Sequence, residues 1–307
     1  MQIIQFAERI KLDETVLTIG NFDGVHLGHQ ALIRRVLKDA NENNAQSALI
    51  TFNPHPQSVL LAHRVPILTN LDQRLEMFER LGLDSVAVIP FTQHLSQLSA
   101  EQFVEQFILS NFKVKGMVIG YDFAFGRNRE GTAAVLEEFS RVHGFFFNVF
   151  PAYDFGEDIV SSTRIRGALN GGDFELAGRL LDRPYSVQGP VVQGLRKGRQ
   201  LGFPTLNLVP EDPLPLVYGV YAVRARLGGE MLEGVCNYGV KPTVGAAVPT
   251  LEVHLFDFGR EAYGESLEVI PLARLREERK FNSLDELRAQ IARDSAQSRE
   301  LLSALSE

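Results

Sequence analysis

In the first half of the chain, continuous apolar runs alternate with segments whose apolar residues recur every three or four positions. The runs are typical of buried strands and the spaced segments of amphipathic helices. Strands are predicted at residues 16–19, 47–52, 86–89, 116–120 and 145–150, and helices at 32–40, 70–81, 100–112 and 132–143. Thr69 is expected to cap the second helix, and Gly144 to end the last. Strands without polar alternation indicate a doubly wound parallel sheet with helices on both faces, whose ligands bind at the carboxyl ends of the strands.

The pattern changes near residues 181–184 (LDRP), where helices stop and short strands with alternating polarity begin. Such alternation is typical of antiparallel strands with one buried face. The strands are predicted at 185–192, 216–227, 231–238, 250–256 and 267–272, followed by a helix at 284–305 with Asn282 or Ser283 as its cap. Five or six strands in about 90 residues favour a small closed barrel. We therefore expect two domains, 1–182 and 183–307.

Length and composition limit the classes of protein. The 307 residues exceed the usual size of a single core, and they carry 31 basic and 38 acidic residues, a formal charge of -7. The acidic balance disfavours a nucleic-acid partner. One cysteine, Cys236, allows no internal disulfide and fits a reducing compartment. No apolar run is long enough to span a membrane and no signal pattern opens the chain, so a cytoplasmic location is expected.

The stretch 17–31 (LTIGNFDGVHLGHQA) reads as strand, glycine-rich turn and helix. Glycine allows close approach of the backbone to a phosphate, and a helix N-terminus offers unpaired N–H groups. His26 and His29 lie three residues apart at that terminus, so both side chains can point into one site. They are candidates for stabilising a triphosphate as it loses pyrophosphate, whereas such a pair elsewhere is more often a surface or core feature.

Two further segments of this half mix polar and aromatic residues. The segment 120–131 (GYDFAFGRNREG) is either a solvated loop or a wall for a flat aromatic ligand with arginines near its phosphates. The segment 160–169 (VSSTRIRGAL) is either a plain capped helix or an anion site where hydroxyls, N–H groups and an arginine meet.

With these motifs and 53–56 (NPHP), the first half resembles the FMN adenylyltransferase module of bacterial bifunctional riboflavin kinase/FAD synthetases. The resemblance implies a nucleotidyltransferase fold with the His26-Leu-Gly-His29 signature, in which His26, His29 and Arg164 are catalytic. It places nucleotide and flavin binding on further residues: Gly20, Phe22, Asp23, Gly24, Gly28, Asn53, His55, Asp122, Phe123, Phe125, Ser161, Ser162, Thr163 and Arg166. Ala124 departs from the family, where arginine is common, which leaves the contribution of the aromatic loop open.

Polar residues of the predicted barrel stand in apolar surroundings. Thr205 and Asn207 face the same side of an extended segment, which suits Mg²⁺ and its phosphates, although a decorated turn would look the same. Glu252 is an acid within an otherwise apolar strand, and a carboxylate there is costly unless it serves chemistry such as accepting a hydroxyl proton. The chain lacks a phosphate-binding P-loop sequence.

The second half resembles a riboflavin kinase domain through 194–207 (GLRKGRQLGFPTLN), 218–220 (YGV), 237–243 (NYGVKPT) and 251–257 (LEVHLFD). The resemblance implies that Thr205 and Asn207 bind magnesium and nucleotide and that Glu252 is the base. It also implies substrate contacts by Gly198, Gly202, Pro204 and Asn237. Which of Arg196, Lys197 and Arg199 contacts a phosphate stays open.

The resemblance covers essentially the whole chain and implies two activities. The barrel would phosphorylate riboflavin with ATP and Mg²⁺, and the parallel-sheet domain would join FMN to a second ATP, giving FAD and pyrophosphate. Three alternatives remain open: one degenerate half, a non-catalytic flavin sensor, or a tRNA-directed ligase. The expected partners are riboflavin, FMN and ATP, without nucleic acid or membrane, in a monomer or weak homo-oligomer.

Overall fold

The computed structural model describes residues 1–5, 12–194, 198, 201–243 and 246–305. The chain divides into two compact units, Met1–Ser162 and Thr163–Glu307. Each unit has its own sheet and its own core. The division lies at the start of helix α7 (Ser162–Asn170), ahead of the boundary expected after residue 182, which stays a prediction.

The first unit contains a sheet of six strands in the order β1-β4-β3-β2-β5-β6, all of them parallel. The strands are β1 (Gln2–Gln5), β2 (Leu12–Ile19), β3 (Gln46–Asn53), β4 (Ser85–Pro90), β5 (Phe112–Gly120) and β6 (Phe146–Phe150). From β2 the chain first runs outward through β3 and β4, and it then returns to β5 on the other side of β2. The predicted doubly wound sheet is confirmed, and its switch point lies between β2 and β5. The edge strand β1 was not predicted from the sequence.

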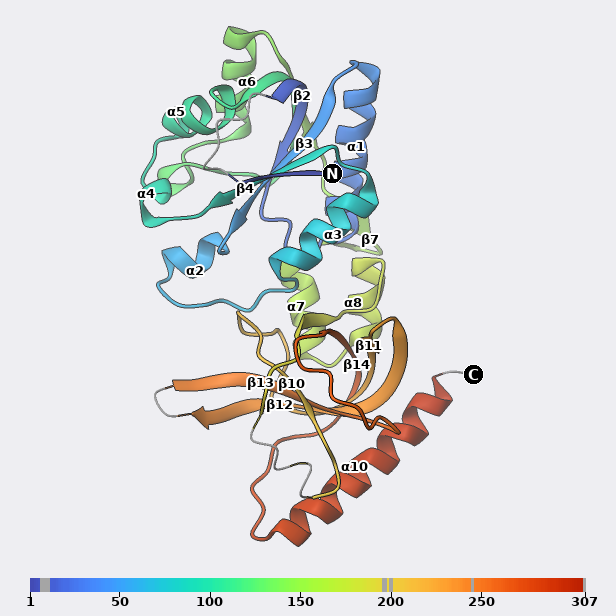
Figure 1. Ribbon diagram of the computed structural model, residues 1–307. Coiled ribbons are helices and arrows are strands. Elements are labelled where there is room, and N and C mark those ends of the chain that lie inside the picture. The colour runs from blue at the N-terminus through green and yellow to red at the C-terminus, as the bar shows by residue number, and fades with distance from the viewer. Residues whose placement is uncertain (6–11, 195–197, 199–200, 244–245, 306–307) are drawn as a thin grey trace. The chain divides into compact units, whose positions relative to one another are not determined.

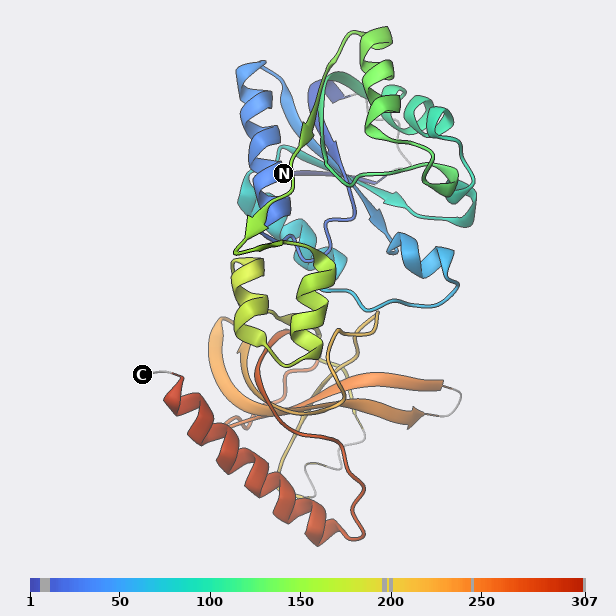
Figure 2. The ribbon, with the colours of Figure 1, turned by 180° about the vertical axis from the view of Figure 1, so that it is seen from behind.

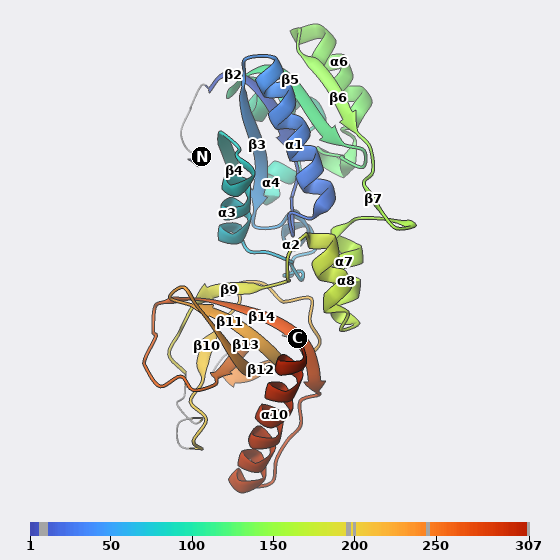
Figure 3. The ribbon, with the colours of Figure 1, turned by 90° about the vertical axis from the view of Figure 1, so that its right-hand side faces the viewer.

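Amphipathic helices cover both faces of this sheet (Figure 1). Helices α1 (Leu27–Glu42) and α3 (Leu71–Leu81) lie on one face, and Figure 3 brings α1 to the front. Helix α5 (Ala100–Phe103), the π-helical turn 104–109 and helix α6 (Ala133–His143) lie on the other. Consecutive β3 residues show the two-sided burial, since fully buried Leu49 packs in the core beneath α1 and fully buried Ile50 in the opposite core.

Short elements complete this unit. They are helix α2 (Pro56–Leu60), helix α4 (Gln93–Ser96), a single 3-10 turn (Arg127–Arg129) and a hairpin of β7 (Asp154–Phe155) with β8 (Asp158–Ile159).

Two helix predictions differ in detail from the structure. Asn70, not Thr69, caps α3, because Asn70 and Gln73 satisfy each other's backbone N–H groups in a capping box. The Thr69 hydroxyl instead accepts a hydrogen bond from the Gly24 N–H at 2.9 Å. The helix expected at 100–112 widens into a π-helical turn after Phe103 and ends at Leu109, and β5 already begins at Phe112.

In the second unit, α7 is followed by helix α8 (Phe174–Leu181) and an antiparallel sheet in the order β10-β13-β12-β11-β14-β9. The strands are β9 (Val187–Pro190), β10 (Leu206–Leu208), β11 (Gly219–Leu227), β12 (Glu230–Thr243), β13 (Ala246–Leu255) and β14 (Ser266–Arg276). Just beyond β9, the Val192 N–H donates to the Asn207 carbonyl at 2.8 Å, which joins the two ends of the sheet. The predicted small antiparallel barrel is confirmed, and it is nearly closed.

The C-terminal helix α10 (Leu284–Ala304) lies along the barrel (Figure 2). Ser283 caps it, one of the two residues predicted to do so. Leu302 is fully buried against the barrel core, and the Ser298 hydroxyl donates to the Gly234 carbonyl at 2.9 Å. The Arg276 guanidinium binds both carboxylate oxygens of Asp294, a buried residue, at 2.8 to 3.0 Å. Apolar packing, the Ser298 hydrogen bond and ion pairs, among them the bidentate Arg276–Asp294 pair, thus join the helix to the barrel.

We expect Asp294→Ala to lower the free energy of unfolding of the second unit by about 3 kcal/mol, because the Arg276 charge loses its partner in a partly buried site. Urea unfolding followed by circular dichroism measures the change. Glu300→Ala removes an exposed carboxylate from the same helix and should leave stability within about 0.5 kcal/mol. Equal effects of the two changes would contradict a special role for the ion pair.

Two candidate active sites

The glycine turn between β2 and α1 has an unusual backbone. Its φ angles are positive at Phe22 (50°), Gly24 (85°) and Val25 (41°), and a positive φ is rare for any residue with a branched side chain. The buried Phe22 ring lies against Gly20, where an added Cβ atom would approach it to 3.0 Å. These constraints bring the N-terminus of α1 to the carboxyl edge of the sheet, where a ligand is expected.

Two buried charged residues fasten this turn. The Asp23 carboxylate accepts hydrogen bonds from the Leu68 N–H at 2.9 Å and the Thr69 N–H at 3.1 Å. Arg74, from α3, donates to the Asn21 carbonyl at 2.8 Å and to the Thr51 hydroxyl at 2.9 Å. Asp23 therefore has a structural task, and its contact with a nucleotide stays a prediction. Arg74 was missed from the sequence, although an arginine four residues before buried Phe78, on the apolar side of an amphipathic helix, was the available signal.

The two histidines lie together at the start of α1. His26 is the N-cap residue, and its Nδ1 accepts a hydrogen bond from the His29 N–H at 3.3 Å. The imidazole rings are stacked, with centroids 3.6 Å apart, and the Phe22 and His29 rings pack edge to face with centroids 5.1 Å apart. Burial is the main cause that holds the pKa of His29 well below its ordinary value, and the positive charge of Arg74 acts in the same direction. His29 is thus a neutral imidazole at pH 7.

Neutral histidines at this place can donate hydrogen bonds to an anion. Because Nδ1 of His26 accepts a bond, the proton of neutral His26 lies on Nε2. Nδ1 of His29 is buried and has no hydrogen-bond partner among the described residues. Such an orphaned polar atom beside the N-terminus of a 16-residue helix suits a phosphate group.

The Ser-Ser-Thr segment meets the glycine turn within the first unit. The Ser162 hydroxyl donates to the Asp23 carbonyl at 2.9 Å, which joins two motifs 139 residues apart in sequence. Thr163, Arg164 and Arg166 follow in α7 and belong to the second unit. The contacts predicted for these three residues and for Ser161 remain predictions.

The other predicted residues of this half lie at two strand ends. Asn53 ends β3, and the His55 side chain caps α2 by accepting the Gln57 N–H at 3.2 Å. After β5, the Phe123 and Phe125 rings stack with centroids 5.5 Å apart, and Phe125 also packs against Phe103 in the core. Phe125 is therefore first a core residue. Ligand contacts by Asn53, His55, Asp122 and Phe123 stay predictions.

In the barrel, the strand register gathers three predicted residues. Glu252 of β13 lies directly opposite Asn207 of β10 on one side and Asn237 of β12 on the other. Directly opposed residues place their side chains on the same face of a sheet. A carboxylate therefore stands between two carboxamides, and the Asn237 amide also donates to the Glu278 carboxylate at 3.3 Å. Glu278 was missed, because it comes from the segment after β14.

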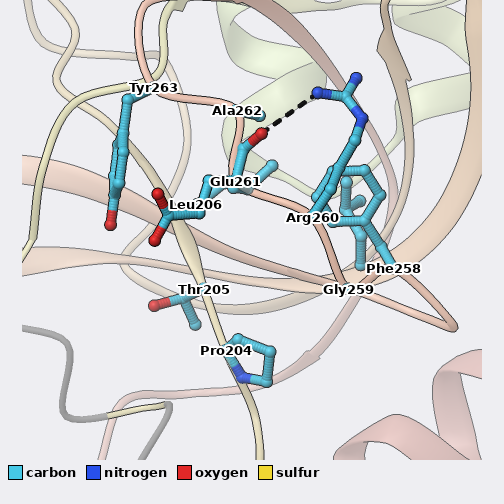
Figure 4. Close-up of a pocket in the computed structure, with 10 residues that line it drawn as sticks. Pro204, Thr205, Leu206, Phe258, Gly259, Arg260, Glu261, Ala262 and Tyr263 are labelled. Carbon is cyan, nitrogen blue, oxygen red and sulfur yellow. Dashed lines mark hydrogen bonds between the residues drawn. The ribbon is translucent and has the colours of Figure 1, made fainter.

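Thr205 lies just before β10 and lines a pocket of about 120 Å³ with Pro204, Leu206, Leu255 and residues 258–263. Figure 4 shows the Tyr263 hydroxyl and the Glu261 carboxylate on the same side of this pocket as the Thr205 hydroxyl. Glu261 and Tyr263 were not predicted. The preceding turn is held by a hydrogen bond from the Phe203 N–H to the Gly198 carbonyl at 2.8 Å, and Gly202 adopts φ 87° in it. Arg196, Lys197 and Arg199 lie outside the described residues.

The oxygen donors of Thr205, Asn207 and Glu252 are of the hard kind that Mg²⁺ prefers. Among the described residues there is no cluster of three histidine, cysteine, aspartate or glutamate side chains that could hold a metal alone. A few oxygen ligands supplemented by nucleotide phosphates are the ordinary protein environment of Mg²⁺, so the residues present fit this ion.

These two units define a class: a nucleotidyltransferase-type α/β domain and a kinase-type β-barrel in one chain. Comparisons with known proteins agree. The FAD synthetase family model matches residues 8–164, and the riboflavin kinase family model matches residues 181–302. A bifunctional riboflavin kinase/FMN adenylyltransferase from Haemophilus influenzae is 39% identical, over 92% of each chain. That from Bacillus subtilis is 38% identical, over 92% of this chain and 90% of its own. The chain belongs to the bifunctional riboflavin kinase/FMN adenylyltransferase family, which confirms the predicted resemblance.

A solved structure also resembles the whole chain. It is titled a macrolide-efflux protein from Streptococcus pneumoniae, is 30% identical, and aligns with a TM-score of 0.79 over 97% of this chain and 99% of its own. Its title names a different activity from that of the curated relatives and describes that protein. In the part of this chain that the structure describes, no helix has the length and apolar character needed to cross a membrane.

Because the pKa of His29 lies well below 6.5, we expect its imidazole to stay neutral from pH 8 to pH 6. Below pH 6.5 the unfolded chain takes up a proton at this site before the folded chain does, so His29 lowers stability as the pH falls toward its folded pKa. NMR titration, with the signal assigned through His29→Gln, measures this. A His29 signal that titrates near pH 6.5 would contradict the buried neutral state.

Gly194 closely approaches Asn207, and an added Cβ atom would overlap the Asn207 amide nitrogen. Gly194→Ala should therefore displace Asn207 and lower kcat/KM for riboflavin phosphorylation about tenfold to a hundredfold. Gly189→Ala is the matched control in the same barrel, because its Cβ atom would meet Leu208 at an ordinary 3.4 Å. Unchanged kinetics in Gly194→Ala would show that Asn207 needs no fixed position.

Proposed function

We propose that this chain converts riboflavin to FMN in its barrel and FMN to FAD in its parallel-sheet unit, using one ATP in each step. Membership in the bifunctional family supports both activities. The observation that carries the kinase assignment is the row of Asn207, Glu252 and Asn237 across three strands. For the second activity it is the stacked histidine pair at the start of α1.

In the kinase step, Glu252 accepts the proton of the ribityl hydroxyl as its oxygen attacks the γ-phosphorus of ATP, and ADP leaves. Thr205 and Asn207 hold the nucleotide through their oxygen atoms and would hold Mg²⁺, which offsets phosphate charge when bound. The pocket beside Thr205 offers the nucleotide a partly enclosed place, with the Glu261 carboxylate and the Tyr263 hydroxyl at its side.

In the adenylyl step, the FMN phosphate attacks the α-phosphorus of ATP and pyrophosphate leaves. A phosphate dianion needs no base, so the residues position and stabilise charge. His26 and His29 donate hydrogen bonds to the triphosphate together with the N–H groups of α1. We assign Arg164 to the same anion because the segment 161–166 (SSTRIR) matches the second phosphate-binding element of the family that the chain resembles.

The three alternative functions would require different sets of residues. A non-catalytic flavin sensor has no need of Glu252 between two asparagines, and a single-activity enzyme has no need to keep both polar sets. A tRNA-directed ligase would favour a basic surface, whereas the chain has a charge of -7. We further propose a cytosolic enzyme that is a monomer or a weak homo-oligomer.

We expect Glu252→Gln to lower FMN formation at least a hundredfold and to leave conversion of FMN to FAD unchanged, because only the first step needs a base. His29→Ala should do the reverse, with a loss of about a hundredfold in FAD formation. Incubation with flavin, Mg²⁺ and ATP, followed by chromatography of the flavins, measures both steps.

Each activity is the control for the folding of the other variant. Wild-type chain that makes FMN and no FAD would refute the second activity, and unchanged riboflavin would favour the sensor. Loss of both activities in either variant, with the fold intact by circular dichroism, would refute separate sites.

A further inference from the structure

The segment that carries Thr205 has little support from the barrel sheet. Strand β10 begins only at Leu206, where it pairs with Val253 of β13. The hydrogen-bond ladder between β10 and β13 cannot continue regularly before Leu206, because Pro204 has no N–H group to donate. Thr205 therefore lies between the last ladder pair and a glycine-containing turn, and a further contact is needed to fix its position.

The side chain of His254 supplies this contact. Its Nδ1 lies 2.8 Å from the Pro204 carbonyl oxygen. A carbonyl oxygen only accepts hydrogen bonds, so Nδ1 carries the proton and donates it. The imidazole is itself held by edge-to-face contacts with Phe203 at 5.3 Å and Phe256 at 6.0 Å between ring centroids. The bond joins a half-buried histidine of β13 to the residue just before Thr205.

The strand register relates the His254–Pro204 hydrogen bond to the proposed catalytic residues. Asn207 lies opposite Glu252, and continuing that antiparallel register places His254 opposite Thr205. His254 is two residues from Glu252, so both side chains extend from the same face of β13. One strand thus carries the proposed base and also anchors the segment of Thr205 and Asn207, which sets the distance between base and nucleotide.

We propose that His254 is a positioning residue of the kinase site: its Nδ1–H fixes the Pro204 carbonyl and thereby holds Thr205 and Asn207 at the nucleotide. In this role His254 acts through the Pro204–Asn207 segment that it holds. This inference rests on the proposed kinase function of the barrel. The feature of His254 that the kinase site requires is the Nδ1–H donor, and not the bulk of the imidazole ring.

Two substitutions separate these roles. His254→Phe keeps an aromatic ring against Phe203 and Phe256 but lacks the donor. His254→Asn loses the ring and keeps an N–H donor at the position of Nδ1. We expect His254→Phe to raise the KM for ATP at fixed free Mg²⁺ about tenfold or more, with little change in the KM for riboflavin. His254→Asn should stay within about threefold of wild type, and FAD formation from FMN should be unchanged in both.

A second readout does not depend on turnover. Hydrogen exchange of the backbone amides at 205–208, followed by mass spectrometry, should be at least tenfold faster in His254→Phe and close to wild type in His254→Asn. Wild-type exchange in His254→Phe overturns the inference whether or not the chain phosphorylates riboflavin. Equal loss in both variants also overturns it, because ring packing would then be the requirement. A chain that makes no FMN but shows the expected exchange refutes the kinase function and keeps the anchor.

Discussion

Transfer of a phosphoryl or adenylyl group imposes one constraint on both units: charged oxygens must be held in place while the protein forms no covalent bond to them. The hydrogen-bond donors and charges that hold these oxygens each contribute little alone, and they are effective only when they are correctly placed. In the first unit, position comes from a turn with three positive φ angles, fastened by Asp23 and Arg74. In the second, it comes from strand register, which sets Glu252 between two asparagines. Much of the polar structure near each site serves placement.

This division of labour explains why some motif residues have tasks other than ligand contact. Both carboxylate oxygens of Asp23 accept backbone N–H groups, and the Phe125 ring completes a core. A sequence motif includes residues that contact a ligand and other residues that hold these contacting residues in place. The two kinds differ in burial and in hydrogen-bond partners, which only the folded chain displays.

The sequence was informative where the cause is local. Apolar periodicity predicted both fold classes, and the spacing of His26 and His29 predicted a pair at one helix start, because these depend on residues close in the chain. The pairing of Glu252 with Asn207 spans 45 residues and depends on how strands close into a barrel, so only the resemblance to a family pointed to it. Arg74, Glu278 and the His254 anchor were missed for the same reason: each meets its partner through tertiary packing. The prediction of the α3 cap was wrong by one residue. Asn70 and Thr69 are both good caps, and the Thr69 hydroxyl accepts a hydrogen bond from the distant Gly24 N–H instead.

The two histidines, identical in residue type, are constrained by different interactions. In His26 a hydrogen bond fixes the tautomer: Nδ1 accepts the His29 N–H, so the proton of the neutral ring lies on Nε2. For His29 it is burial beside positive charge, which keeps the ring neutral. Neutral donors can follow the charge that develops on a leaving pyrophosphate, yet they cannot offset several negative charges. That task needs a cation. A helix N-terminus and the magnesium that accompanies ATP can supply positive charge, and in the function proposed above an arginine adds to it while the histidines direct the triphosphate.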